Sequence, residues 1–241
     1  MTCALLIPAV AHAGAWLAPE GGGQVVVTTL AAFADRAYTS GWNTQATPAY
    51  SKVEAQALFE YGVTDWFTAI AMPTLQGIDI AAPTTARRGG FGYSDFGGRI
   101  RVLASGPWVI SAQATIRVPG TRDSANPAAI GYTGIEVDAR ALVGVSFAVA
   151  DMPAFVNVEA AQRFRNGAPP GEFRADLTFG VRPWARWLFM AQSFSVIAES
   201  AGAPPFTRYA YHKLQLSAAY DLTRSLTLQG GGYATYAGTN A

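Results

Sequence analysis

Sixteen charged residues lie in segments where polar and apolar side chains alternate, and all sixteen occupy the polar positions of that alternation. They are Lys52, Glu54, Glu60, Asp95, Arg99, Arg101, Arg117, Glu136, Asp138, Arg140, Glu159, Arg163, Arg174, Asp176, Arg182 and Lys213. Both signs occur in similar numbers. Such side chains either neutralise one another in salt bridges or line a pore and set its preference for ions or solutes, and the sequence alone leaves both interpretations open.

Catalytic chemistry has little support in the same set of residues. Glu136 and Asp138 lie two positions apart on one strand face, a placement compatible with acid–base chemistry. Arg140 comes next on that face, however, and favours an ion pair. His212 is followed by Lys213 and a leucine, so it lacks the serine of a His-x-Ser pair. We therefore expect no enzyme, and the sequence indicates no cofactor and no metal site.

The composition narrows the fold class. Half of the 241 residues are hydrophobic and only 14% are charged, whereas soluble domains are about 25% charged. The net charge of +1 argues against a nucleic-acid partner, and the high apolar content excludes disorder. No apolar run reaches the roughly 18 residues that a transmembrane helix needs. A closed barrel of β-strands is the other structure that can span a membrane.

Strict alternation of polar and apolar residues predicts strands along the whole chain. The clearest example covers residues 50–61, where side chains at odd and even positions would point to opposite faces. The sequence predicts eleven strands, near residues 23–34, 50–61, 66–76, 95–102, 110–118, 135–141, 154–164, 173–182, 187–197, 213–218 and 226–236. Most are about ten residues long, which suits a tilted crossing of a bilayer better than an ordinary strand of about five or six residues.

The connections between these strands alternate between two kinds. The short ones are residues 62–65, 104–107, 148–153, 183–186 and 221–225, and the longer ones are 35–49, 77–93, 119–133, 165–171 and 198–208. Outer-membrane barrels combine short periplasmic turns with longer extracellular loops in this way. Four tryptophans, Trp66, Trp108, Trp184 and Trp187, lie in or just after short turns, where an aromatic girdle is expected.

A soluble lipocalin-like barrel would show the same alternation with its apolar residues inside. Strand length, the asymmetry of the connections and the N-terminal segment all favour a membrane barrel instead. A charged side chain facing lipid costs roughly 2–4 kcal/mol at the bilayer midplane. We therefore expect the sixteen charged residues to line the lumen and the alternating apolar residues to face lipid.

The first thirteen residues read as the end of a secretory signal peptide. Their apolar run is followed by Ala11-His12-Ala13, a small-x-small cleavage site, which predicts a barrel domain over residues 14–241. The alternative is a buried N-terminal strand. Cys3 would be removed with the signal, so the mature chain would contain no cysteine. These features predict a location in the bacterial outer membrane.

Eleven strands are an odd number, whereas single-chain bacterial barrels have an even number. The alternation of turns and loops also directs the strand at 226–236 outward, so that residues 237–241 would begin another outer loop. We therefore expect the sequence to be a fragment of a twelve-stranded barrel that lacks its C-terminal strand. This predicts a gap between residues near 25–33 and 226–236.

Several short motifs resemble those of a proteobacterial outer-membrane family of transporters labelled for the meta-cleavage pathway of phenol degradation. They are EYGVTDW at 60–66, SDFGGRIR at 94–101, VPG at 118–120, HKLQLS at 212–217 and YDLT at 220–223. The likeness extends over most of residues 14–241. Phe96 and Gly97 replace a usual aliphatic-rich pair, and the family's aromatic-ended last strand is missing. The resemblance implies a barrel that takes up small compounds, aromatic ones among them, and it carries no catalytic residues.

Two functions therefore remain in consideration. The first is an outer-membrane channel or transporter that passes small solutes through a charge-lined lumen. The alternative is a structural or surface-exposed outer-membrane protein whose lumen is plugged by its own side chains. Outer-membrane lipid is an expected partner in both cases, and a small-molecule solute only in the first.

Overall fold

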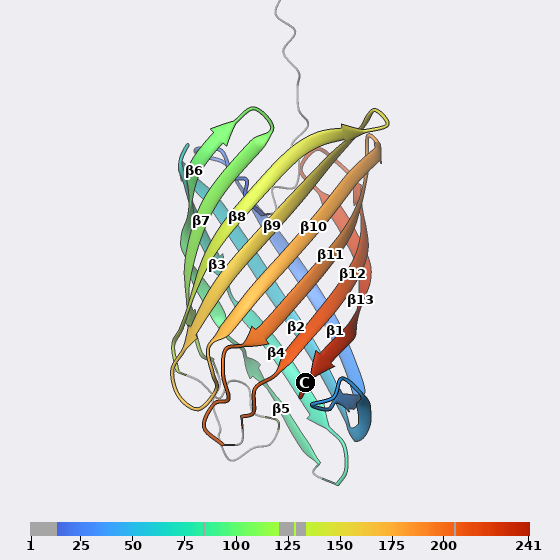
Figure 1. Cartoon of the computed structure of the whole chain (residues 1–241). Helices are drawn as coiled ribbons and strands as arrows, with labels where there is room; N and C mark the ends of the chain where they lie inside the picture. Colours follow the sequence, from blue (N-terminus) through green and yellow to red (C-terminus); the bar gives the residue numbers. More distant parts are fainter. Residues whose placement is uncertain (1–13, 84, 121–127, 129–133, 205) are drawn as a thin grey trace, which may run out of the picture.

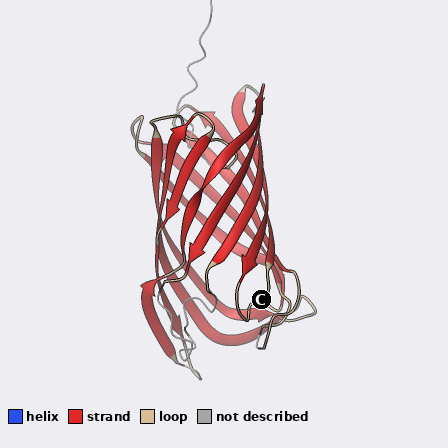
Figure 2. Ribbon diagram, turned by 90° about the vertical axis from the view of Figure 1, so that its left-hand side faces the viewer, coloured by secondary structure: helices blue, strands red, loops and turns tan. Residues whose placement is uncertain are grey.

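The computed structural model describes residues 14–83, 85–120, 128, 134–204 and 206–241. The predicted signal remnant, residues 1–13, lies outside these ranges, as does most of the connection at 119–133. All regular elements of the described residues are β-strands, and they form one antiparallel sheet that curls into a barrel (Figures 1 and 2). Among the described residues, no helix is long and apolar enough to cross a membrane.

Each strand pairs mainly with its neighbours in the chain, as in an up-and-down barrel. The strands are β1 (Gly23–Tyr38), β2 (Thr44–Thr64), β3 (Phe67–Met72), β4 (Thr74–Ile80), β5 (Ala86–Phe91), β6 (Ser94–Ser105), β7 (Trp108–Val118), β8 (Glu136–Val149), β9 (Met152–Arg165), β10 (Glu172–Trp184), β11 (Trp187–Ala198), β12 (Ala210–Asp221) and β13 (Thr227–Thr239). The predicted all-β antiparallel fold is confirmed.

The thirteen strands differ in number from the eleven predicted ones because the predicted strand 66–76 is interrupted and because β5 lies in the predicted connection 77–93. β3 and β4 both pair with β2 and are separated only by Pro73, which has no amide hydrogen to donate to a ladder. In the same way, β5 and β6 are separated by Gly92 and Tyr93, and they pair with β4 and β3 respectively. The barrel wall therefore has eleven traverses.

Two connections that the sequence analysis treats as long loops are mostly strand. β1 continues to Tyr38 and β2 starts at Thr44, with Tyr38 opposite Thr44, and β4 and β5 form a hairpin over much of 77–93. Proline, glycine and threonine made these regions look like loops. Cross-strand backbone pairing outweighs that local preference, and an ion pair of 3.4 Å between Arg87 and Asp79 adds to it in the hairpin.

The two faces of the sheet differ as the alternation predicts. Large apolar side chains are exposed on one face, with Val27 73% and Phe33 78% exposed. The other face carries buried polar groups such as Thr115 and Thr178. The four tryptophans at the short turns (Trp66, Trp108, Trp184 and Trp187) are 39–63% exposed, as expected of an aromatic girdle. The short turns lie at the upper end of the barrel in Figure 1.

The first and last strands are not joined by a ladder. Every residue of β1 and β13 is described, yet the two strands share no regular backbone pairing. Their contact is confined to the long-loop end, where the Tyr38 amide donates to the Ala241 carbonyl at 2.6 Å and the Asn240 amide donates to the Thr39 carbonyl at 3.2 Å. The predicted gap is confirmed.

Candidate functional site: the barrel interior

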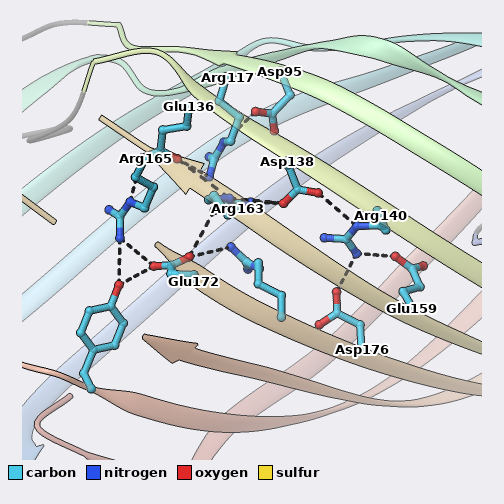
Figure 3. Close-up of polar contacts among 12 residues, drawn as sticks. Asp95, Arg117, Glu136, Asp138, Arg140, Glu159, Arg163, Arg165, Glu172 and Asp176 are labelled. Atoms are coloured by element: carbon cyan, nitrogen blue, oxygen red, sulfur yellow. Dashed lines mark hydrogen bonds and ion pairs between the residues drawn. The ribbon is translucent and has the colours of Figure 1, made fainter. Parts of the chain in front are cut away.

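A network of ion pairs covers the interior of β6 to β10 (Figure 3). One branch of the network, on the right in Figure 3, is centred on Arg140 of β8. The guanidinium contacts Glu159 on β9, Asp176 on β10 at 2.8 Å and Asp138 on its own strand at 3.4 Å. All four side chains are at least four-fifths buried. One arginine thus bridges carboxylates from three adjacent strands.

A second branch of the network is centred on Glu136, the first residue of β8. Its carboxylate accepts from Arg165 at 3.0 Å and lies 3.5 Å from Arg117 and 3.9 Å from Arg163. Arg117 also pairs with Asp95 on β6 at 2.7 Å. Because Arg163 bonds Asp138 at 3.1 Å as well, the two branches form one continuous wall of charge.

Glu172 extends this wall toward the long-loop end. It pairs with Arg165 at 2.8 Å and with Arg174 at 3.5 Å, and it accepts a hydrogen bond from the Tyr209 hydroxyl. Burial and the neighbouring Glu172 raise the pKa of the Tyr209 phenol. Tyr209, in the loop before β12, therefore stays protonated and acts as a donor at neutral pH.

Five further predicted lumen residues form three ion pairs outside this network, and one predicted residue is not paired with an acid. Arg99 donates to Glu60 at 2.9 Å, Lys52 lies 3.0 Å from Glu54, and Arg182 lies 2.8 Å from Asp221. Lys213 differs from all of these. Among the described residues, it has no carboxylate oxygen within ion-pair distance, and its ammonium lies 5.0 Å and 5.5 Å from the ring centres of Tyr211 and Tyr233.

The structure does not bring Arg101 into the interior network. β6 pairs in regular register up to Arg101, which lies opposite Ser111, and its register shift comes only after Arg101, before Leu103. Arg101 is exposed at the short-turn end, where its guanidinium donates to the Asp65 carbonyl.

Arg165 and Glu172 belong to the network but are absent from the predicted set. The signal for them was present, since Arg165 shares the phase of Arg163 and Glu172 shares the phase of Arg174. They were missed because each lies one residue beyond the strand boundaries predicted at 154–164 and 173–182. β9 and β10 include both residues.

The N-terminal segment, residues 14–20, lies inside the barrel at the short-turn end. The Ala15 amide donates to Asn157 of β9 at 2.9 Å, and the Ala15 carbonyl accepts from Ser111 of β7 at 2.5 Å. Arg99 of β6 donates to the Trp16 carbonyl at 2.9 Å, and the Ala18 amide donates to Thr68 of β3 at 3.0 Å. These wall residues each bond backbone atoms of the segment.

The Trp16 side chain occupies an apolar slot in the same end of the interior. It packs edge-on against Phe155 of β9, with ring centres 5.7 Å apart, beside Leu188 of β11 and Ala219 of β12. Gly144 of β8 leaves room for the indole, because a Cβ there would lie only 2.7 Å from the ring. The slot therefore fits a large, flat side chain.

Comparison with known proteins gives one structural likeness. A scan against protein-family models finds no match, and a search of curated proteins finds none either. Among solved structures, the chain is similar to an outer membrane channel from Pseudomonas putida F1, with a TM-score of 0.76 and 14% identity over 96% of this chain and 94% of that one. The barrel, the exposed apolar face and the tryptophan girdle are those of a bacterial outer-membrane protein.

Proposed function

We propose that this chain is a passive outer-membrane channel that passes small solutes, aromatic compounds among them, through its charge-lined lumen. The observation that carries the proposal is Lys213. An ammonium group without a carboxylate partner inside a protein needs water or a polar solute around it. Lys213 is only half-buried, which supports a hydrated path along β12 and β13.

The two walls of the interior suggest the class of solute. The wall from β6 to β10 is neutralised by its own ion pairs, so it has little net attraction for either sign of ion. The opposite wall offers the Lys213 ammonium flanked by two tyrosine rings. An ammonium and adjacent aromatic faces suit a small organic anion that carries a ring. The resemblance to transporters of the phenol-degradation label agrees with this class.

The alternative, a plugged barrel without transport, is favoured by a specific observation. The N-terminal segment fills part of the short-turn end, and Ala15, Ser111 and Asn157 around it are at most 2% exposed. The interior thus combines an ammonium group that, in the described part of the chain, has no carboxylate partner with an obstruction. The two functions differ in whether ions cross the membrane.

Conductance in planar lipid bilayers separates the two functions. The refolded protein and a variant in which residues 15–20 are replaced by a Gly/Ser linker are measured in a salt gradient. Discrete ohmic steps from either protein support the channel, and the reversal potential gives its ion preference. Silence of both proteins at all voltages, with the heat-modifiable gel shift of a folded barrel retained, would overturn the channel and favour the structural role.

A further inference from the structure

We propose that the interior face of β11 is the floor of a carboxylate-binding site, with Arg174 of β10 and Lys213 of β12 as its two cationic arms. The ligand class is a small monocarboxylate with an apolar body. The site rests on the proposed function, because a site inside the lumen serves transport only in a protein that conducts. It goes beyond that function by adding a second cation and an apolar surface to Lys213 and by narrowing the class of organic anion.

The strand register places the two arms on opposite sides of β11. Arg174 lies opposite Val196 of β11, which in turn lies opposite Tyr211 of β12. Two positions along β11, Phe194 lies opposite Lys213. Side chains directly opposite each other in an antiparallel pair share one face of the sheet. Because neighbouring strands are about 4.8 Å apart, the backbones that carry the two arms are about 10 Å apart across β11. Long side chains can reach a small ligand between them.

The interior face of β11 interrupts the charged wall. None of its 12 residues, all of them described, is acidic or basic, whereas β6 to β10 and β12 carry charges on their interior faces. Val196 is 1% exposed, and Phe194 is half-buried, so part of its side chain stays accessible from the interior. An apolar body that lies on this strand removes apolar surface from water. The strand therefore suits the uncharged part of a solute whose charged group reaches an arm.

Arg174 has an unused hydrogen-bond donor. Among the described residues, its ion-pair partner is Glu172, which lies 3.5 Å from its Nη1. Glu172 is shared with Arg163 at 3.7 Å and with Arg165 at 2.8 Å. The Nε of Arg174 is buried and has no acceptor in the described part of the chain. A buried donor without an acceptor is destabilising, and an oxygen of a bound carboxylate would satisfy it.

The charges around Lys213 leave its ammonium without compensation. The groups that act on it electrostatically are two cations, Lys52 and Arg174, and one carboxylate, Glu54. Glu54 already pairs with Lys52 at 3.0 Å. Opposite charges attract more strongly where water is partly excluded. Arg174 and Lys213 therefore act together on an anion that lies between them.

A second negative charge on the ligand has no place in the site. Asp176 lies two residues from Arg174 on the same face of β10, opposite Phe194. Its Oδ2 accepts from Arg140 at 2.8 Å, and its Oδ1 is buried without a hydrogen-bond partner among the described residues. Two carboxylates that share a partly buried site disfavour each other's charge. The site therefore favours monocarboxylates over dicarboxylates of similar size.

The test is equilibrium binding to the refolded full chain in detergent micelles, measured by isothermal titration calorimetry. Benzoate is the probe, benzamide is its uncharged counterpart, and terephthalate is its dicarboxylate relative. We expect benzoate to bind at least about tenfold more tightly than either of them, because hydrogen bonds to charged groups are the stronger ones. Arg174→Gln and Lys213→Gln should each weaken benzoate binding at least about tenfold for the same reason.

Arg182→Gln is the matched control. Arg182 also lies on β10, but it pairs with Asp221 at 2.8 Å near the short-turn end. This variant should bind benzoate like the parent protein. The heat-modifiable gel shift of a folded barrel checks that every variant has folded, and the comparison of benzoate with benzamide needs no variant at all.

Equal affinity for benzoate and benzamide, or unchanged benzoate binding in either Gln variant of an arm, would overturn the site. If the protein still conducts in planar bilayers, the channel function stands without it. Terephthalate binding as tight as that of benzoate would overturn the choice of monocarboxylates. Benzoate binding that needs both arms, in a protein that is silent in bilayers, supports the site and overturns the channel function.

Discussion

Removing Arg140 should destabilise the barrel strongly. Its guanidinium is the shared partner of Asp138, Glu159 and Asp176. An Arg140→Met variant leaves Glu159 and Asp176 facing each other without this cation, while Asp138 keeps Arg163. Breaking a buried pair costs about 3–5 kcal/mol, and an exposed pair contributes at most about 1 kcal/mol. The side chains of Arg140 and Asp176 are each only 13% exposed. We therefore expect the Arg140→Met variant to lose about 3 kcal/mol of the free energy of unfolding.

The assay is equilibrium unfolding in urea, with the barrel in lipid vesicles and tryptophan fluorescence as the signal. Arg140→Met should lower the free energy of unfolding by about 3 kcal/mol, the lower end of the cost of breaking a buried pair. Adding Asp176→Asn should restore part of that loss, because it removes one of the unpaired charges. Arg101→Met is the control. Arg101 is exposed and outside the network, so its variant should change stability by less than about 0.5 kcal/mol.

Two results would refute this reasoning. If Arg140→Met and Arg101→Met are equally stable, the interior is wet enough to solvate the carboxylates without a cation. If Asp176→Asn destabilises the Arg140→Met protein further, the carboxylates do not repel one another, and the loss has another origin, such as packing of the arginine stem.

Three more predictions test other features. Lys213→Gln should reduce anion preference in bilayer reversal potentials while Lys213→Arg preserves it, and equal values for both would exclude Lys213 from selectivity. Gly144→Val should displace the indole of Trp16, since a Cβ there already lies 2.7 Å from the ring; quenching of its fluorescence by acrylamide should increase. In liposomes, a water-soluble maleimide should label a cysteine at position 176 faster than one at 177, and the reverse order would mean that the two faces of β10 are exchanged.

The period-two pattern was enough to predict the architecture. Each traverse of the barrel contains a stretch in which one face is apolar and the other polar, and that alternation follows directly from strand geometry. The odd number of traverses likewise predicted that β1 and β13 would lack a regular ladder. The predicted elements differed from the observed ones at residues 35–49 and 77–93. Both regions are hairpins of mixed composition near the long-loop end, where backbone pairing and not side-chain burial determines the strand.

The partners within the interior could not be predicted in the same way. Alternation assigns Arg140 and Glu159 to one face, but which acid each arginine contacts depends on register and tilt across several strands. The role of the N-terminal segment was also missed, because Trp16 and Ala18 have no periodic pattern and their partners Thr68, Ser111 and Asn157 are ordinary polar residues in strands. Only the curled sheet brings them together.

The bonds of the N-terminal segment also have a mechanical consequence for the barrel. The edge strands β1 and β13 share no ladder, and the described bonds across that edge join residues 38–39 to residues 235 and 240–241. The segment links β3 on one side of the interior with β9, β11 and β12 on the other. It thus acts as a cross-brace at the end of the barrel opposite those few edge bonds. Removal of this brace would let the wall relax outward at the short-turn end, so the diameter of the barrel there depends on seven residues that are not part of its wall.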